Sequence, residues 1–288
     1  MGSVEETVRA EEEAAPTVTS VDIESIITTL SPCAELETGL KVNLKPPFVV
    51  SPVSHTFETT LEPEALSPMF SGVEWAGTQC WKASIECIKV LHERRLTLEG
   101  GTRRAIELGC GLGVPGVSLS FMYKSLQSVT LTDSPKLLDQ LKRNTKSLDN
   151  VKAAALWWGE DDAFQELLSS TAPPNSDPST GKSKPAGWDL VLCCDCIYEP
   201  LYGKSWQPLA SVLMSCLDIN RACVVLVACE RRASDNLQAF LEIILKNGKS
   251  VTMEERGERS GTVVHLEEGV VTPLTEGEIQ IYTITNQP

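Results

Sequence analysis

The most constraining feature of this chain is a glycine-rich run, IELGCGLGVPG at residues 106–116. Arg104 to Leu108 predicts a strand that leads into it, and Val114 to Tyr123 predicts a helix that follows, with Pro115 tolerated in the first helical turn. Glycine lets the backbone turn sharply and approach a ligand without a Cβ atom, and a helix start offers free backbone amides. The run therefore predicts a ligand-binding turn. A tight structural turn in an α/β protein is the alternative.

An acidic residue stands where such a turn needs a partner for a nucleoside. SVTLTD at residues 128–133 predicts the next strand, and it ends in Asp133, twenty residues beyond Gly113. A carboxylate at this place can accept hydrogen bonds from both hydroxyls of a ribose. Strand, glycine loop, helix, strand and terminal acid together predict a site for a nucleoside cofactor.

Two cofactor classes match the glycine spacing. Gly111-x-Gly113-x-x-Gly116 fits the dinucleotide fingerprint, whereas Glu107-x-Gly109-x-Gly111-x-Gly113 fits the acid-first pattern of S-adenosylmethionine enzymes. A carboxylate beside the loop suits a cationic sulfonium and ammonium, and it would repel a pyrophosphate. We find no proton-donor set typical of a dehydrogenase. The residues favour S-adenosyl-L-methionine over a nicotinamide cofactor.

Strands and helices alternate along the chain from residue 78 onward. Further strands are predicted at 151–158, 189–194, 223–229 and 277–285, and helices at 78–94, 135–148, 204–217 and 234–246. The strands DLVLCC and CVVLVAC carry no polar alternation, which is typical of strands buried on both faces. This alternation predicts an α/β fold with a parallel sheet, helices on both faces and right-handed crossovers.

Charge and composition divide the chain into segments. Residues 1–40 hold nine acidic residues and one basic residue, and so carry more than half of the net charge of −14. We expect them to be a mostly disordered acidic tail, with a short helix near 20–30. Residues 41–77 are rich in proline and are expected to pack on the core as a leader. Residues 78–288 form the predicted catalytic domain, with a flexible insertion at 171–187.

Composition also narrows partners and location. The acidic balance disfavours nucleic acid as a partner, and no apolar run is long enough to span a membrane. The ten cysteines lack the spacing of a zinc site, so we expect no metal. Without an N-terminal secretory signal they indicate reduced thiols, and we expect a monomer in the cytoplasm or also in the nucleus.

Separated pieces of the chain carry a family resemblance. They are Trp81 ahead of a helix, the Glu107–Gly113 loop, Trp158-Gly159 after the third strand, the D-x-x-Y sequence Asp195–Tyr198 after the fourth, and Ala228–Arg232 after the fifth. In these pieces the chain resembles the seven-strand family 16 protein methyltransferases, close to the methyltransferase-like 21 group. Most members of that family methylate protein lysines.

The resemblance implies a fold and an activity. The fold would be a Rossmann-like class I methyltransferase, a doubly wound and mostly parallel seven-stranded sheet with helices on both faces. The activity would be S-adenosylmethionine-dependent methyl transfer to a protein side-chain nitrogen, the lysine ε-amine, by direct displacement. Three alternatives stay open: a small-molecule substrate, a nucleic-acid substrate, and an inactive cofactor-binding module that interacts with partners.

The resemblance also assigns roles to residues. The expected cofactor-binding residues are Trp81, Glu107, Gly109, Cys110, Gly111, Gly113, Asp133, Trp158 and Cys194. Asp195 and Tyr198 are expected to form the catalytic mouth. Asp195 is a poor general base for lysine, because their reference pKa values are about 3.9 and 10.4, so its expected role is to orient the amine and guide its proton to water.

Each of these residues also has a structural alternative. Trp81 and Trp158 could be core aromatics. Tyr198 could be a packing residue, and Asp195 could cap the following helix. The run Glu230-Arg231-Arg232 could be a solvated loop or an internal ion pair.

Overall fold

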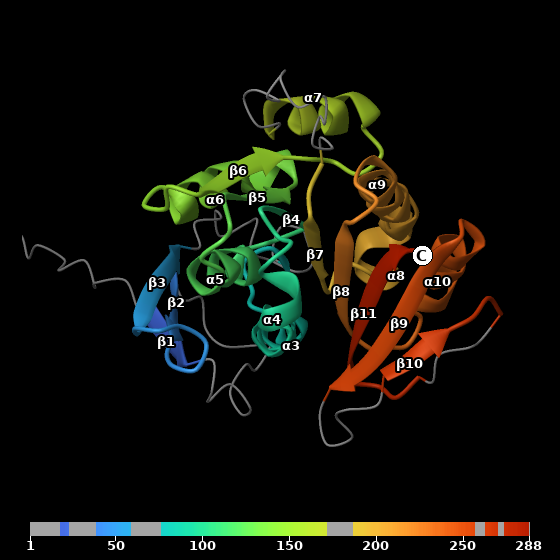
Figure 1. Ribbon diagram of the computed structural model, residues 1–288, viewed down its shortest axis with the longest axis horizontal. Coiled ribbons are helices and arrows are strands. Elements are labelled where there is room, and N and C mark those ends of the chain that lie inside the picture. The colour runs from blue at the N-terminus through green and yellow to red at the C-terminus, as the bar shows by residue number, and fades with distance from the viewer. Residues whose placement is uncertain are drawn as a thin grey trace, which may run out of the picture.

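The computed structural model describes residues 18–22, 39–58, 76–171, 187–256, 263–269 and 274–287. Their centre is an eight-stranded sheet (Figure 1). From one edge to the other it contains β10 (Val263–Leu266), β9 (Lys249–Arg256), β11 (Ile279–Asn286), β8 (Val224–Glu230), β7 (Leu190–Cys194), β4 (Arg104–Leu108), β5 (Ser128–Asp133) and β6 (Val151–Ala155).

The sheet is parallel at its centre and antiparallel at one end. β8, β7, β4, β5 and β6 run parallel, whereas β11 is antiparallel to both β8 and β9, and β10 is antiparallel to β9. β4 and β7 are buried at every position, as expected for strands covered on both faces. The predicted α/β class is confirmed, with one strand more than the expected seven.

Helices cover both faces of the sheet (Figure 1). On one face lie α3 (Lys82–Glu93), α5 (Val114–Met122) and α6 (Leu138–Thr145), the last preceded by the 3-10 turn η1 (Pro135–Leu137). On the other lie α7 (Asp161–Thr171), α9 (Trp206–Ile219) and α10 (Leu237–Lys246). Each face has its own apolar cluster, so the sheet lies between two cores.

Three short helical segments connect the longer elements. α4 (Arg95–Leu98) follows α3, while α8 (Glu199–Tyr202) and the 3-10 turn η2 (Gly203–Ser205) come between β7 and α9. The sequence pattern did not predict α7, β9 or β10. No described helix has the length and apolar character needed to cross a membrane.

A second, three-stranded sheet precedes the central one in the chain. β2 (Gly39–Leu44) pairs in parallel with β1 (Val18–Asp22) and antiparallel with β3 (Val53–Glu58). Figure 1 shows these strands beside α5 and α6. The Asn144 side chain on α6 accepts a hydrogen bond from the Glu58 amide at 2.7 Å, and Phe57 is fully buried. Residues 41–58 of the expected leader therefore belong to a sheet on the α5–α6 face, and residues 59–75 lie outside the described residues.

The acidic tail differs from the prediction where the structure describes it, and most of the expected insertion lies outside the described residues. Val18–Asp22 is a strand, where a disordered tail with a short helix was expected. Its β-branched residues favour an extended conformation once β2 offers hydrogen-bonding partners. The rest of that tail, and residues 172–186 of the expected insertion, lie outside the described residues.

Candidate functional site

The carboxyl ends of three adjacent strands meet at one edge of the sheet. Leu108, the last residue of β4, pairs with Thr132 of β5 on one side and with Cys193 of β7 on the other. The chain proceeds outward from β4 through β5 to β6, and then returns to place β7 on the opposite side of β4. Ligands of open α/β sheets bind at such a switch point.

The glycine loop that follows β4 has left-handed backbone and no room for side chains. Gly109 has φ +60°, and a Cβ there would lie 2.6 Å from the Cys196 Sγ atom and 2.9 Å from the Trp158 ring. Gly111 has φ +54°, and a Cβ there would lie 3.3 Å from the backbone of Gly77. Only glycine meets both requirements at these positions. The loop is thereby closed in by segments that are far away in the sequence.

Asp133 fixes the loop from the end of β5. One carboxylate oxygen accepts a hydrogen bond from the Gly111 amide at 2.8 Å, and the other accepts one from the Ser134 amide at 2.7 Å. Burial raises the pKa of Asp133, and the two amide donors oppose that rise. Each carboxylate oxygen keeps further lone-pair capacity, so Asp133 can hold the loop and still accept bonds from a ribose.

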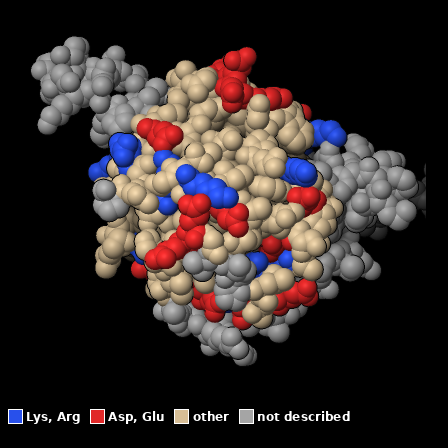
Figure 2. Space-filling view, turned by 90° about the vertical axis from the view of Figure 1, so that its right-hand side faces the viewer, with Lys and Arg blue, Asp and Glu red and all other residues tan. Residues whose placement is uncertain are grey.

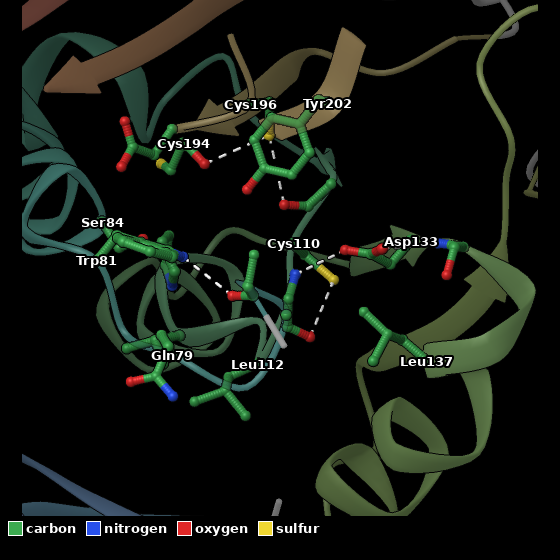
Figure 3. A pocket seen from close by; sticks show the side chains of 18 of the residues that line it. Gln79, Trp81, Ser84, Cys110, Leu112, Asp133, Leu137, Cys194, Cys196 and Tyr202 are labelled. Atoms are coloured by element: carbon green, nitrogen blue, oxygen red, sulfur yellow. Dashed lines mark hydrogen bonds between the residues drawn. The ribbon is translucent and has the colours of Figure 1, made fainter. Parts of the chain in front are cut away.

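These elements enclose a pocket (Figure 3) with about 1010 Å³ of empty space, including the space open to solvent at its mouth. Figure 3 shows Trp81 and Asp133 on opposite sides of it, with Tyr202 and Cys196 along a third side. Of the predicted site residues, the lining includes Trp81, Gly109, Cys110, Gly111, Asp133, Trp158, Cys194 and Asp195. Residues from five strand ends and loops are thus brought to one cavity.

Trp81 lies at the start of α3, and a hydrogen bond from its indole fixes the side chain. Its Nε1 donates to the Ala76 carbonyl oxygen at 3.0 Å. The Gly77 carbonyl in turn accepts a hydrogen bond from the Gln140 amide on α6, at 3.2 Å. The segment before α3 therefore spans the glycine loop, and it makes Trp81 part of a wall rather than of a core. Trp75, a second tryptophan nearby, lies outside the described residues.

Asp195 lines the pocket in an unusual backbone conformation. It has φ +57°, and its amide continues the β7–β8 pairing with a 2.7 Å bond to the Ala228 carbonyl. Its carboxylate is paired with Arg232 at 2.6 Å and 3.1 Å, so it does not cap the following helix. Burial raises the pKa of Asp195, and the Arg232 guanidinium opposes that shift. The run at 230–232 thus contains an internal ion pair.

The structure places three predicted site residues away from the pocket lining. Glu107 is 1% exposed, and its carboxylate accepts a hydrogen bond from the Gly116 amide at 2.7 Å. It ties β4 to α5 instead of facing a ligand. Gly113 is the left-handed N-cap of α5, with φ +81°. The Tyr198 ring packs against Arg232, whose Cζ lies 5.3 Å from the ring centroid.

Several lining residues were not predicted from the sequence. Tyr202 and Ser205 come from α8 and η2, a segment that begins four residues after Asp195. The Ser205 Oγ atom is buried and has no hydrogen-bond partner among the described residues. Spacing could have suggested Tyr202, because it lies one helical turn beyond Tyr198. Further unpredicted lining residues are Ala76, Gly77, Gln79, Cys80, Ser84, Leu112, Val114, Pro115, Ser134, Leu137, Leu156, Trp157 and Cys196.

A family comparison assigns this chain. The family model described as lysine methyltransferase matches residues 64–172 and 176–247, together more than half of the chain. The chain belongs to the lysine methyltransferase family. This confirms the resemblance carried by the five motif pieces. The cofactor of this lysine methyltransferase family member is S-adenosyl-L-methionine.

One relative matches part of the chain, and the similar solved structures share little sequence identity with this chain. The chain is 48% identical over 146 residues to the secreted RxLR effector protein 48 of Plasmopara viticola, in an alignment that covers 46% of the chain and 66%, just under two thirds, of that relative. Similar solved structures include a putative RNA methyltransferase from Pyrococcus horikoshii (14% identity, 73% of this chain and 88% of that chain, TM-score 0.44). Another is the human methyltransferase 10 domain containing protein (11%, 69% and 81%, TM-score 0.43).

The pocket of this lysine methyltransferase family member fits its cofactor chemically. Gly109 and Gly111 let the backbone of the loop approach a ligand closely, Asp133 offers acceptors for a ribose, and Ser205 offers a buried hydroxyl that has no partner among the described residues. Trp158 lies against the loop and lines the pocket, and an aromatic side chain there suits contact with an adenine. Among the described residues, no group of three or more His, Cys, Asp or Glu is arranged to hold a metal ion.

Proposed function

We propose that this protein transfers a methyl group from S-adenosyl-L-methionine to the ε-amine of a lysine in another protein. The observation that carries the proposal is the pocket at the β4, β5 and β7 strand ends, in a chain of the lysine methyltransferase family. The charge of the chain supports a protein as the substrate. A net charge of −14 favours a basic polypeptide segment over a nucleic acid.

The surface charges support the same choice. On the face that Figure 2 shows, Lys and Arg side chains lie beside Asp and Glu side chains. Elsewhere in the described residues, Lys246 and Glu242 on α10 form an ion pair at 3.6 Å. No continuous basic surface is present on the described part of this face. A nucleic-acid groove needs such a surface for its phosphates.

The reaction needs positioning more than acid or base strength. S-adenosyl-L-methionine, when bound, would supply a methyl group on a sulfonium, and its sulfur would leave as the neutral thioether. The protein must align the amine, and such positioning can contribute about 7–11 kcal/mol. Trp81 and Tyr202 line the pocket, and their rings would confine the amine beside the cofactor. Asp133 and the glycine loop hold the cofactor in one orientation.

The amine must also be uncharged. For a lysine with a reference pKa of about 10.4, deprotonation at pH 7 costs about 4.6 kcal/mol. Desolvation at the pocket mouth and the sulfonium charge both favour the neutral amine. We propose that Asp195 forms part of this mouth, and that the proton leaves to water.

One experiment tests the proposal directly. The full chain is incubated with S-adenosyl-L-methionine labelled in its methyl group and with a cell lysate, and labelled bands are analysed by mass spectrometry. We expect methyl-lysine in a protein band, and no label with Asp133→Ala. Label in nucleic acid or in a small-molecule fraction would contradict the lysine assignment. Cofactor binding without any transfer would support an inactive binding module.

The cysteines bear on where the protein acts. We propose that the protein acts as a monomer in the cytoplasm, or also in the nucleus. The nine cysteines that the structure describes are all buried free thiols, as in proteins kept in a reducing compartment.

A further inference from the structure

Arg232 lies between two aromatic rings at the pocket mouth. Its Cζ atom is 5.6 Å from the centroid of Trp81 and 5.3 Å from the centroid of Tyr198. A guanidinium at these distances from ring faces is attracted by both rings. Trp81 lines the pocket, so Arg232 lies directly behind the pocket wall. Arg232 therefore occupies the faces that these two rings turn toward the guanidinium, and it lies next to Asp195 at the pocket wall.

Two carboxylates converge on the same guanidinium. Asp195 accepts bonds from both terminal nitrogens of Arg232, at 2.6 Å and 3.1 Å, and Glu230 accepts one at 2.9 Å. The Asp195 side chain is 3% exposed and the Arg232 side chain 24% exposed, so little water screens this pair. Burial alone would lower the pKa of Arg232, but the two carboxylates raise it above its ordinary value. Arg232 is thus permanently charged.

The charges around the mouth nearly cancel. Asp195 and Glu230 are balanced by Arg232 and by Lys82 on α3, whose Nζ lies 3.7 Å from the Glu230 carboxylate. The other titratable groups near this cluster include Tyr198, Tyr202, Cys196, Cys229, the ion pair of Arg231 with Asp235, and Asp133, whose carboxylate also raises the pKa of Tyr202. Burial raises the pKa of Tyr202 and of Cys229, so both are uncharged at neutral pH.

We propose that Arg232 is a positioning residue that neutralises Asp195 and occupies the Trp81–Tyr198 rings, so that the mouth receives the substrate amine in its uncharged form. The inference rests on the proposed function and adds the charge state in which the substrate enters. An unpaired Asp195 would hold a lysine ammonium tightly, but an ammonium has no lone pair for the methyl group. Pairing Asp195 with Arg232 removes that unproductive complex.

A binding measurement tests the charge balance without any turnover. S-adenosyl-L-methionine and S-adenosyl-L-homocysteine differ by the methyl group and the positive charge on sulfur, so the ratio of their dissociation constants reports the potential near the transferred methyl. We would measure both by calorimetry for the wild type, Arg232→Met and Arg232→Lys. In Arg232→Met we expect the ratio to shift about three- to tenfold toward the methyl donor, because Asp195 loses its cationic partner and Glu230 keeps only Lys82. Arg232→Lys keeps the positive charge but not the two-point contact with Asp195, so its ratio should lie between those of the wild type and Arg232→Met.

A second pair of variants covers the case in which Arg232→Met does not fold. Asp195→Asn leaves Arg232 with one carboxylate, so the ratio should shift in the opposite direction. The double variant Asp195→Asn/Arg232→Met should return toward the wild-type ratio, since it removes one charge of each sign. A ratio that is the same in all folded variants would overturn the inference.

An activity measurement separates this inference from the proposed function. With labelled donor and the lysate band that the wild type methylates, Arg232→Met should need a pH about one unit higher for half-maximal transfer, and the profile of Arg232→Lys should lie between those of Arg232→Met and the wild type. If the wild type binds the donor but methylates no protein, the proposed function fails. If it methylates a protein and neither the ratio nor the pH profile depends on Arg232, only the inference fails.

Discussion

Asp133 is the residue on which cofactor binding depends most. Its carboxylate holds the Gly111 and Ser134 amides and is also the expected acceptor for the ribose. Asp133→Ala should weaken binding of S-adenosyl-L-homocysteine by at least about tenfold, because hydrogen bonds to a charged group contribute about 1.5–3 kcal/mol. Calorimetry measures this directly. Asp133→Asn keeps an acceptor and should lose less. Wild-type affinity in Asp133→Ala would contradict the ribose assignment.

Two tyrosines one helical turn apart differ in their environment. Tyr202 lines the pocket, whereas the Tyr198 ring packs on Arg232. Tyr202→Ala should therefore weaken binding of S-adenosyl-L-homocysteine about tenfold or more, through lost ring contacts. Tyr198→Ala is the matched variant and should stay within about twofold. The reverse order of the two affinities would show that the pocket wall is assigned to the wrong tyrosine.

At the scale of the elements, Glu107 joins β4 to α5 from a fully buried position. Burial raises the pKa of Glu107 to about 8, and the nearby Asp133 adds to the rise while the Gly116 amide opposes it. The folded protein thus binds this proton more tightly than the unfolded chain, whose glutamates titrate near about 4.3. Glu107 should therefore reduce the free energy of unfolding as the pH rises from about 4.3 to about 8.

Glu107→Gln tests this linkage. Glutamine keeps an acceptor for the Gly116 amide and does not titrate. Relative to the wild type, the variant should gain about 3–4 kcal/mol in free energy of unfolding between pH 5 and pH 8. Urea unfolding at the two pH values measures the difference. A pH-independent offset between the two proteins would mean that Glu107 does not titrate in this range.

At the scale of the whole molecule, the leader sheet belongs to the folded domain. Phe57 on β3 is 0% exposed and lies in the same apolar cluster as α3 and α5. Phe57→Ala should lower the free energy of unfolding by about 3–5 kcal/mol, the cost of a large cavity. Val50→Ala, at a position that is 72% exposed, is the control and should change it by less than about 0.5 kcal/mol. Equal stability of the two variants in urea would mean that the leader is not part of the cooperative unit.

The sequence by itself determined the parallel centre of the fold and the cofactor loop. Apolar strands without polar alternation are typical of strands buried on both faces, and the glycines at 109, 111 and 113 let the backbone approach a ligand closely. Asp133 could also be predicted from the sequence, because it is the last residue of its strand. These signals are local, since neighbours in the chain carry the whole pattern.

Only the tertiary structure decided which side chains form the pocket mouth. Glu107 and Tyr198 stand in the right motifs, yet one points to the Gly116 amide and the other to Arg232. The pairing of Asp195 with Arg232 joins the ends of β7 and β8, which lie 37 residues apart in the chain. β9 and β10 likewise could be assigned only from the structure, in which β9 pairs with both β10 and β11. Such contacts depend on where a neighbouring strand ends, and the periodicity of a single segment does not contain that information.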